Sequence, residues 1–588
     1  MTNWFIKNKK ADINKIASEN NISKVLAKLL INRDIYDSNE IKEFLNPDID
    51  EMHSPILMDD VNLATSIIKT KIDKNLKIRI VGDFDVDGIM SVYILYTTLN
   101  LIGADVDYVI PDRVLDGYGI NNHIVLNAKA QGIDTIITCD NGISAFEPIK
   151  TAKKMDMTVI ITDHHEIPYV RVKDNLEYSL PDADVIINPK KKSCTYPFKD
   201  LCGAAVAYKL AQNLLLEYKS NFNHQDLLEF VAIATICDVV DLKGENRTIV
   251  VEGLKRLKST QNIGLNLLIE VNGLTDKKIG VYHVGFILGP CFNASGRLDS
   301  AILGLSLLLE QDYKKSIKIA ESLKNLNDER KRLTADGVDA IDGLIKTYYS
   351  KDKVLVAFYP DLHESIAGII AGRLKEKYNK PTIVLTRVSD GVKGSARSIE
   401  AYDIYEELTK CSNLLTKYGG HPMAAGMSLL EQNIEELRKQ LNKNCTLTDD
   451  DLDPKTYIDM SYPIQSINES FITEIERLQP FGKGNPKPLF GDKMANIKRA
   501  SLLGKNRNVL KLIFDKDDGE NKEAIIFRNI EKWVTNIEIV YGIEEKEKLF
   551  AGLDNTVKMD ILYSPSINEY MGNKTIQFVI DDYRLLKH

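Results

Sequence analysis

Five short apolar runs between residues 78 and 188 constrain the fold more than any other feature of the chain. They read IRIVGD, ADVDYVIPD, DTIITCD, TVIITD and ADVIIN, and three of the stretches between them are long enough for a helix. Short buried strands that alternate with helices are typical of βαβ units and a parallel sheet. We therefore expect an α/β domain over residues 56–260.

The rest of the chain divides into segments of different character. At roughly 150 residues per domain, 588 residues suggest about three or four units. Apolar residues at helical spacing predict a small helical N-terminal lead-in over residues 1–55 and a long helical connector over residues 261–345. A second α/β pattern covers residues 346–450, and the acidic run TLTDDDLDP then predicts a solvated linker. Residues 456–588 contain short strands such as NVLKLIF, EAIIF and IEIVYGI, which favour a small β-barrel or sandwich.

Composition excludes several classes of protein. The net charge of −8 and pI of about 5.8 argue against a basic footprint over the whole surface, so any contact with nucleic acid must be local. The seven cysteines include no Cys-x-x-Cys pair, which argues against a zinc ribbon or a disulfide framework. No apolar run approaches the roughly 20 residues of a membrane span, and the N-terminus lacks a signal-peptide pattern, so we expect a cytoplasmic protein without membrane contact.

Acidic residues stand where the apolar runs end. Asp83, Asp85 and Asp87 follow the first run at intervals of two, and alternation along a strand would point their carboxylates in one direction. Aspartates beside a glycine are also ordinary turn residues, which is the alternative interpretation. However, ligands of open parallel sheets bind outside the carboxyl ends of the strands, and four of the five runs end at an aspartate.

Further candidate ligands lie at the ends of later runs. TCDNGIS contains Asp140, ITDHHEIP contains Asp163, His164 and His165, and ATICDVVDL contains Asp238. A histidine pair can also be a hydrogen-bonded part of a core, but four such clusters in one α/β unit favour a shared site. Carboxylates with one or two imidazoles suit Mg²⁺ or Mn²⁺. We infer a hydrolytic centre that holds two divalent metal ions.

These motifs resemble those of a known family. GDFDVDG, DNG, DHH and ATICDVVDL are similar to the motifs of the DHH phosphoesterase superfamily. PDRVLDGYGI, GPCFNASGRLDS, GSARS, YGGHPMAAGMSL and LQPFGKGNPKPLF resemble the RecJ family of single-strand-specific exonucleases within it. The resemblance implies a parallel-sheet DHH catalytic domain, a DHH-associated substrate-binding domain and a C-terminal OB-fold barrel. It also implies a 5′ to 3′ exonuclease that releases mononucleotides from single-stranded DNA in repair and recombination.

The resemblance also assigns roles at the metal centre. It implies that two Mn²⁺ or Mg²⁺ ions are held by six residues: Asp83, Asp85, Asp87, Asp140, His164 and Asp238. Asp140 is the expected bridge between the ions, and Asp83 would ligate one of them or orient a water. His165 would contact the scissile phosphate or assist the leaving oxygen.

A second set of residues suits an anionic phosphate. In GSARS, Ser395, Arg397 and Ser398 would offer hydroxyls, a guanidinium and the backbone amides of a turn before a helix. An ordinary turn with a surface arginine is the alternative. The resemblance favours a pocket for the terminal 5′-phosphate, shared with Arg113.

The motif YGGHPMAAGM adds the remaining candidates. Gly419 and Gly420 would let the backbone approach a ligand closely, and His421 would reach a substrate phosphate from the second α/β domain. Arg297, supported by Asn293, is a further candidate for binding phosphate.

Two other functions remain open from the sequence. A DHH phosphodiesterase for short oligonucleotides or cyclic dinucleotides would need no domain after PFGKGNPKPLF, and a non-catalytic replication scaffold would not need every acid. For the nuclease we expect single-stranded DNA as the partner, a single-strand-binding protein and a helicase as further partners, and a monomer. Lys505, Arg507 and Lys511 loosely fit a strand-binding face on the C-terminal barrel.

Overall fold

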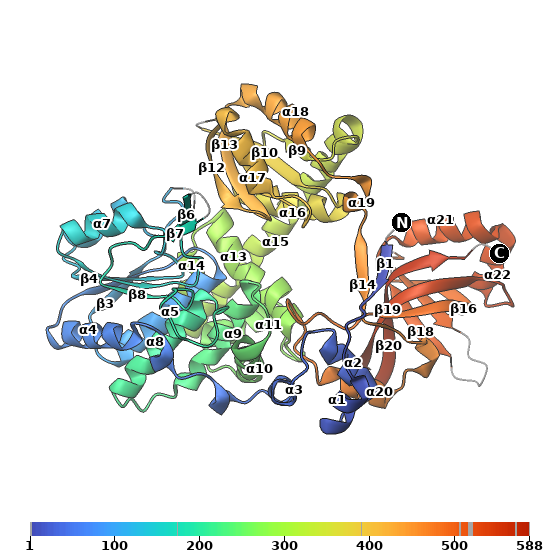
Figure 1. Ribbon diagram of the computed structural model, residues 1–588, viewed down its shortest axis with the longest axis horizontal. Coiled ribbons are helices and arrows are strands. Elements are labelled where there is room, and N and C mark those ends of the chain that lie inside the picture. Colours follow the sequence, from blue (N-terminus) through green and yellow to red (C-terminus); the bar gives the residue numbers. More distant parts are fainter. Residues whose placement is uncertain are drawn as a thin grey trace. The chain divides into compact units, whose positions relative to one another are not determined.

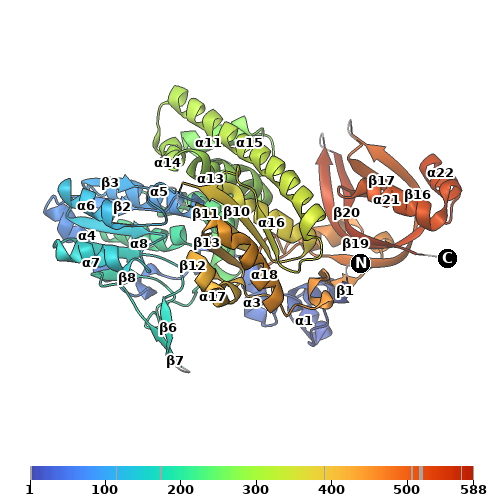
Figure 2. The same cartoon turned by 90° about the horizontal axis from the view of Figure 1, so that it is seen from above.

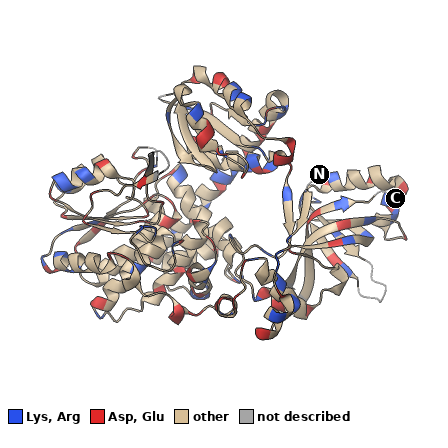
Figure 3. Cartoon of the chain, viewed as in Figure 1, with Lys and Arg blue, Asp and Glu red and all other residues tan. Residues whose placement is uncertain are grey.

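The computed structural model describes residues 3–586, except for residues 114, 173–174, 390, 505–506, 515–520 and 571–572. Lys505, one of the basic candidates on the barrel, therefore lies outside the described residues. The chain forms two compact units, Ile49–Pro454 and a second unit made of Met1–Asp48 with Lys455–His588. Figure 3 shows acidic and basic residues interspersed on the elements of both units.

The expected parallel sheet forms the first half of the larger unit (Figure 1). Its order is β3-β2-β4-β5-β8, and every neighbouring pair is parallel. The strands are β2 (Ile78–Val81), β3 (Val106–Val109), β4 (Thr135–Cys139), β5 (Thr158–Thr162) and β8 (Val185–Ile187). Its helices are α4 (Val61–Asp73), α5 (Val86–Leu101), α6 (Asn122–Ala130), α7 (Phe146–Lys154) and α8 (Gly203–Glu217).

Helices cover both faces of this sheet because both faces of its strands are apolar. On β4, Ile137 packs into the same core as α4, α5 and α8, whereas the preceding residue, Ile136, packs into the core of α6 and α7. This alternation explains why the strands read as continuous apolar runs. A two-stranded hairpin of β6 (Tyr169–Val172) and β7 (Asn175–Tyr178) projects from the domain (Figure 2).

Helices follow the sheet and end in one long helix. They are α9 (Leu228–Cys237), α10 (Gly244–Leu257), α11 (Ile263–Val271), α12 (Val281–His283), the π-helical turn η4 (Val284–Leu288), α13 (Gly289–Leu298), α14 (Ile302–Leu309) and α15 (Tyr313–Leu344). The length of α15 suits the helical connector expected over residues 261–345.

A second sheet of mixed direction follows α15. Its order is β12-β13-β11-β10-β9, in which only the β9–β10 pair is parallel. The strands are β9 (Leu355–Phe358), β10 (Thr382–Val388), β11 (Gly391–Arg397), β12 (Leu415–His421) and β13 (Ala424–Leu429), with helices α16 (Ala367–Tyr378), α17 (Ile404–Lys410) and α18 (Ile434–Asn444). The acidic run after α18, expected as a linker, contains the short helix α19 (Asp449–Leu452).

The smaller unit contains the expected barrel. The sheet order is β15-β16-β17-β18-β20-β19, and β16 also pairs with β19, which closes the barrel. The strands are β15 (Met460–Ser461), β16 (Phe490–Leu503), β17 (Val509–Phe514), β18 (Lys522–Ile526), β19 (Lys558–Tyr570) and β20 (Asn573–Leu585). Three helices accompany them: α20 (Glu469–Glu476), α21 (Ile530–Tyr541) and α22 (Ile543–Ala551).

The prediction of a strand at IEIVYGI is wrong, because this segment belongs to the helices α21 and α22. Within it Ile537 is buried, four residues after the buried Trp533, while Ile539 is 73% exposed. The side-chain pattern is therefore helical.

The N-terminal segment is part of the barrel unit and not a separate lead-in. Helices α1 (Ile13–Glu19), α2 (Lys24–Ile31) and α3 (Ser38–Leu45) share the barrel's core, and β1 (Asn3–Ile6) pairs in parallel with β14 (Lys455–Ile458). The buried Arg33 donates to Asn485 Oδ1 at 2.7 Å and to the Pro486 carbonyl at 2.6 Å. These contacts join residues more than 450 positions apart, which no local pattern could predict.

The structure bears on two expectations from composition. All seven cysteines are free thiols. Among the residues described, no helix combines the length and the apolar character that crossing a membrane would require.

Candidate metal centre and phosphate cavity

The three aspartates after β2 are placed by a helix, not by strand alternation as expected. The strand ends at Val81, and Asp85 caps α5, its Oδ1 accepting the N–H of Gly88 at 3.1 Å. Asp87 then lies in the first turn of α5. As a consequence, Asp83 and Asp85 belong to one group of potential metal ligands, and Asp87 belongs to another.

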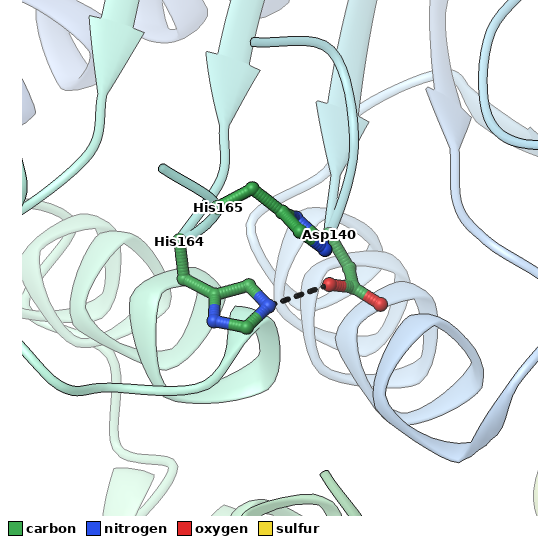
Figure 4. Close-up of side chains that lie close together, drawn as sticks. All are labelled: Asp140, His164 and His165. Atoms are coloured by element: carbon green, nitrogen blue, oxygen red, sulfur yellow. Dashed lines mark ion pairs between the residues drawn. The ribbon is translucent and has the colours of Figure 1, made fainter. Parts of the chain in front are cut away.

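The predicted ligands gather into three overlapping groups, in each of which the ligand atoms lie within 4.8 Å of one another. The groups are Asp83, Asp85 and Asp140; Asp87, His164 and Asp238; and Asp140, His164 and His165. His164 joins them, because its Nε2 lies 3.2 Å from Asp140 Oδ1 and 3.7 Å from Asp87 Oδ2, and its Nδ1 lies 3.8 Å from Asp238 Oδ2. Figure 4 shows His164 pointing at Asp140 from the end of the adjacent strand.

The backbone around these side chains fixes their positions. Asp140 follows β4 in a left-handed conformation with φ of 60°, and the hydroxyl of Tyr118 donates to its carbonyl at 2.9 Å. Asp87 accepts the N–H groups of Gly203 and Ala204 at the N-terminus of α8, at 2.6 and 2.7 Å. A Cβ at Gly203 would lie 2.6 Å from the Cβ of Asp140, so only glycine fits there.

The cluster carries more negative charge than burial allows without a cation. Burial, and then repulsion from Asp85, raises the pKa of Asp83 to about 8, and burial with repulsion from Asp87 raises the pKa of Asp238 to about 8. Burial and the neighbouring carboxylates also raise the pKa of Asp140 well above its usual range. Asp83 Oδ1 is buried without a hydrogen-bond partner. Divalent cations would neutralise these groups, so the donor set fits hard metal ions with oxygen and imidazole ligands.

A basic cavity of about 340 Å³ lies in the same unit. Arg113, Arg297, Ser395 and Arg397 line it, together with the first turn of α16. That turn abuts the polar side chains, because a Cβ at Gly368 would lie 3.0 Å from Arg397 Nη2 and 3.1 Å from Ser395 Oγ. A helix N-terminus beside guanidinium groups is an anion-binding arrangement.

The arginines of this cavity repel one another. Burial, and then the charge of Arg113, lowers the pKa of Arg297 to about 9, and the same two causes lower the pKa of Arg397. Arg297 Nη1 donates to the Ser365 carbonyl at 2.6 Å. Glu364, which also lines the cavity, is paired with Lys393 at 2.8 Å. The cavity thus has an excess of positive charge that a phosphate would neutralise.

Comparisons with known proteins agree with this geometry. Residues 77–235 match the DHH family, N-terminal domain, residues 351–446 match the DHHA1 domain, and residues 458–582 match the RecJ OB domain. The single-stranded-DNA-specific exonuclease RecJ of Bacillus subtilis is 33% identical over 98% of this chain and 70% of its own length. The chain belongs to the RecJ family.

Solved structures of RecJ proteins share the fold. Thermus thermophilus RecJ in complex with Mn²⁺ superposes with a TM-score of 0.80 and 24% identity, over 100% of this chain and 80% of that one. An exonuclease RecJ bound to manganese has a TM-score of 0.58 and 28% identity, over 67% of this chain and 96% of that one.

Not every predicted phosphate ligand lies in the basic cavity of this RecJ-family chain. Ser395 and Arg397 lie two apart on β11, so they share a face of a strand and are not in the turn expected from GSARS. Ser398 is buried outside the cavity, and its hydroxyl donates to the Tyr402 carbonyl at 2.5 Å. The prediction for Ser398 is therefore wrong in its geometry, because the residue after the strand turns into the core.

The glycine–glycine–histidine motif lies on β12. Gly419 lines a neighbouring cavity of about 410 Å³, which shares Arg113 and Ser395 with the first. Gly420 has φ of 152°, and a Cβ there would lie 2.4 Å from a backbone oxygen of the facing strand. His421 is exposed at the end of β12 and lines neither cavity.

Two residues, Asp163 and Asn293, have other contacts than the sequence suggested, since Asp163 was named among the candidate ligands and Asn293 as a support for Arg297. Asp163 accepts the backbone N–H groups of Ile143 and His164, and its Oδ1 lies 2.7 Å from His165 Nδ1. Burial alone would lower the pKa of His165, but this contact outweighs it and raises the pKa to about 9. Asn293 Oδ1 accepts the N–H of Val86, so it supports the aspartate turn directly. The position of Asp163 at a strand end was the available signal.

Proposed function

We propose that this chain is a metal-dependent exonuclease that degrades single-stranded DNA from the 5′ end and releases mononucleotides, in DNA repair and recombination. The observation that carries the proposal is the buried cluster of carboxylates and His164, with an unpartnered Asp83 oxygen, in the same unit as the arginine cavity. The B. subtilis relative is named as a single-stranded-DNA-specific exonuclease, and a 28% identical relative was solved with bound manganese.

Six residues would hold two Mn²⁺ or Mg²⁺ ions: Asp83, Asp85, Asp87, Asp140, His164 and Asp238. Bound there, the ions supply Lewis-acid activation of water and neutralise charge on the phosphodiester. Asp140 and His164 each stand in two of the three ligand groups, and of the two only Asp140 has two oxygens to offer, which supports its role as the bridge. The N-terminus of α8 orients Asp87, and Asp163 orients His165.

His165 is suited to the oxygen that leaves the phosphorus. Its raised pKa keeps the imidazole protonated near neutral pH. Asp163 holds Nδ1, and Nε2 lies 3.3 Å from the Tyr118 hydroxyl, so Nε2 is the nitrogen that would turn to the substrate and donate a proton. His421 would contact a substrate phosphate from the end of β12.

The arginine cavity would give the reaction its direction. Anchoring a terminal 5′-phosphate on Arg113, Arg297, Ser395 and Arg397, close to Gly419 and Gly420, would fix the distance from the strand end to the metal centre. Asp83 and Asp85 act on the pKa of Arg113 through their charges, so the cavity is electrostatically adjacent to the metal centre. Cleavage would then proceed one nucleotide at a time.

An end-labelling assay tests the proposal. Single-stranded DNA labelled at either end, matched duplex and matched RNA are incubated with Mn²⁺ or Mg²⁺ and sampled over time. We expect a 5′ label to appear first as a mononucleotide and the duplex to resist. Earlier release of a 3′ label would contradict the direction.

The Asp140→Asn variant tests the metal centre, with Asp336→Asn as the control, because Asp336 lies on the exposed face of α15 paired with Arg332. Asp140→Asn should abolish hydrolysis while retaining DNA binding, and Asp336→Asn should leave both unchanged. Near-normal turnover by Asp140→Asn would refute the bridging role.

The proposal includes a monomer that acts in the cytoplasm, on strands made available by a helicase and a single-strand-binding protein. Comparing kcat/KM for a dinucleotide and for long strands distinguishes the proposed nuclease from a small-substrate phosphodiesterase. The matched OB domain supports the long strand as substrate. The retained carboxylates support catalysis over a scaffold role.

A further inference from the structure

Two large aromatic rings lie exposed on the helical segment before α13. Tyr282 is 64% and Phe286 is 69% exposed, and their rings stack with centroids 5.2 Å apart and an interplanar angle of 26°. Their spacing of four residues puts them on one helical face. Phe286 lies in the π-helical turn η4, and such turns frequently occur at functional sites.

The segment that carries these rings continues along the metal centre. At its near end, a Cβ at Gly289 would lie 2.3 Å from Cys237 Sγ, next to the ligand Asp238. At its far end, a Cβ at Gly296 would lie 2.4 Å from the Phe84 carbonyl oxygen, between Asp83 and Asp85 in the sequence. Helix α13 therefore runs from the Asp238 side of the cluster to the Asp83 side.

The ends of this segment have different neighbours. Arg297, directly after Gly296, lines the arginine cavity. Tyr282 and Phe286 precede Gly289, so they lie beyond the Asp238 side of the cluster. A strand whose 5′ end occupies the arginine cavity and whose scissile phosphate reaches the metal centre would continue toward the two rings.

The surroundings of the rings suit nucleic acid. Lys277 and Lys278 are exposed shortly before Tyr282, in a chain whose overall charge is negative. Aromatic rings with nearby cations are the usual combination that holds unpaired bases and their phosphates.

On the basis of the proposed function, we propose that Tyr282 and Phe286 form a stacking platform for unpaired bases on the 3′ side of the scissile phosphate. Bases in a duplex are already stacked and paired, so the platform would favour single strands. This assigns substrate contacts to a helical segment outside both the metal ligands and the arginine cavity.

The Tyr282→Ala/Phe286→Ala double variant tests the platform. Because base–aromatic stacking contributes about 1–3 kcal/mol per base, we expect KM for a long 5′-phosphorylated strand to rise about 5- to 150-fold for each base lost from the platform, with kcat unchanged. A 5′-phosphorylated dinucleotide has only one base on the 3′ side of the scissile phosphate, so its KM should rise less than that of the long strand. Tyr313→Ala, which removes a ring that is 58% exposed at the start of α15, is the matched control.

Two further comparisons separate stacking from a general apolar contact. Tyr282→Phe/Phe286→Trp should keep the wild-type KM, whereas Tyr282→Leu/Phe286→Leu should behave like the alanine variant. Strands with one abasic site, moved stepwise from the 5′ end, should show a position at which wild-type KM rises and the alanine variant is unaffected.

An unchanged KM for the alanine variant, a wild-type KM for the leucine variant, or equal sensitivity of both enzymes to every abasic site would each overturn the platform. A protein partner as the true occupant would give the first of these results. If no preparation hydrolysed single strands, the proposed function itself would fail, whereas hydrolysis with a flat abasic profile refutes the platform alone.

Discussion

Replacing Arg397 by methionine separates recognition of the strand end from catalysis. Methionine keeps much of the length and the apolar stem but removes the guanidinium. In the free protein Arg397 Nη1 donates to the carbonyl of the adjacent Ala396 at 2.8 Å. Burial and the charge of Arg113 already disfavour its ionised form, so losing the charge should not lower the melting temperature.

The size of the effect follows from the contact that would be lost. A hydrogen bond to a charged group contributes about 1.5–3 kcal/mol. At 1.4 kcal/mol per factor of ten, Arg397→Met should lower kcat/KM for a 5′-phosphorylated strand by about 10- to 150-fold. A strand with a 5′-hydroxyl lacks the anion, so its kcat/KM should change little.

The assay is a cycle of two enzymes and two substrates, in which kcat/KM is measured for strands that differ only in the 5′-phosphate. Arg387→Met is the control, because Arg387 is exposed and pairs with Glu431 at 2.8 Å. If Arg397→Met lowered kcat/KM equally for both strands, or for neither, the cavity would not bind the terminal phosphate.

Three further predictions concern stability. Burial raises the pKa of Glu229 from 4.5 to about 7. The folded protein therefore binds this proton more tightly than the unfolded chain, and the stability that the proton contributes, about 3 kcal/mol, is present below pH 4.5 and lost as pH rises through 7. Glu229→Gln should remove most of this pH dependence, so the melting temperature should differ less between pH 5 and pH 8 than in the wild type. Glu245→Gln would leave the fully buried Lys209 ammonium without its carboxylate and should cost about 3–5 kcal/mol in urea unfolding, whereas Lys209→Met/Glu245→Leu should recover much of it. Gly420→Ala should lower the melting temperature because its Cβ has no room, while Gly419→Ala, with nothing within 4 Å, should leave stability unchanged.

Strand ends were the part of the site that the sequence could predict. In a parallel sheet all carboxyl ends meet at one edge, so Asp140 and His164 had to come close whichever side chains filled the core. The sequence correctly predicted that Asp83, Asp85 and Asp87 lie among the potential metal ligands, but it wrongly attributed their positions to alternation along a strand. Their directions depend on where α5 begins, and an N-capping aspartate is hard to distinguish from a strand residue when apolar residues precede it.

Features that depend on distant segments could not be predicted. Ser398 and Arg397 are adjacent in sequence, but only the packing of β11 within the second, mixed sheet decides which of them faces the cavity. Arg33 and Asn485 meet because the two ends of the chain share a core. Removing residues 456–588 alone would therefore expose the apolar residues of α1–α3, and a truncation that preserves folding must remove both segments.

In both the acidic and the basic part of the site, burial and like charges disfavour the ionised side chains. Asp83 and Asp140 have raised pKa values because burial and like charges disfavour their ionised forms, and Arg297 has a lowered pKa for the corresponding reasons. Neither cluster is neutralised by the other, although the charge of Asp85 acts on Arg297. A divalent cation would remove the repulsion among the carboxylates, and a phosphate would remove the repulsion among the arginines. Each cluster thus contains an unfavourable interaction that the proposed ligand removes.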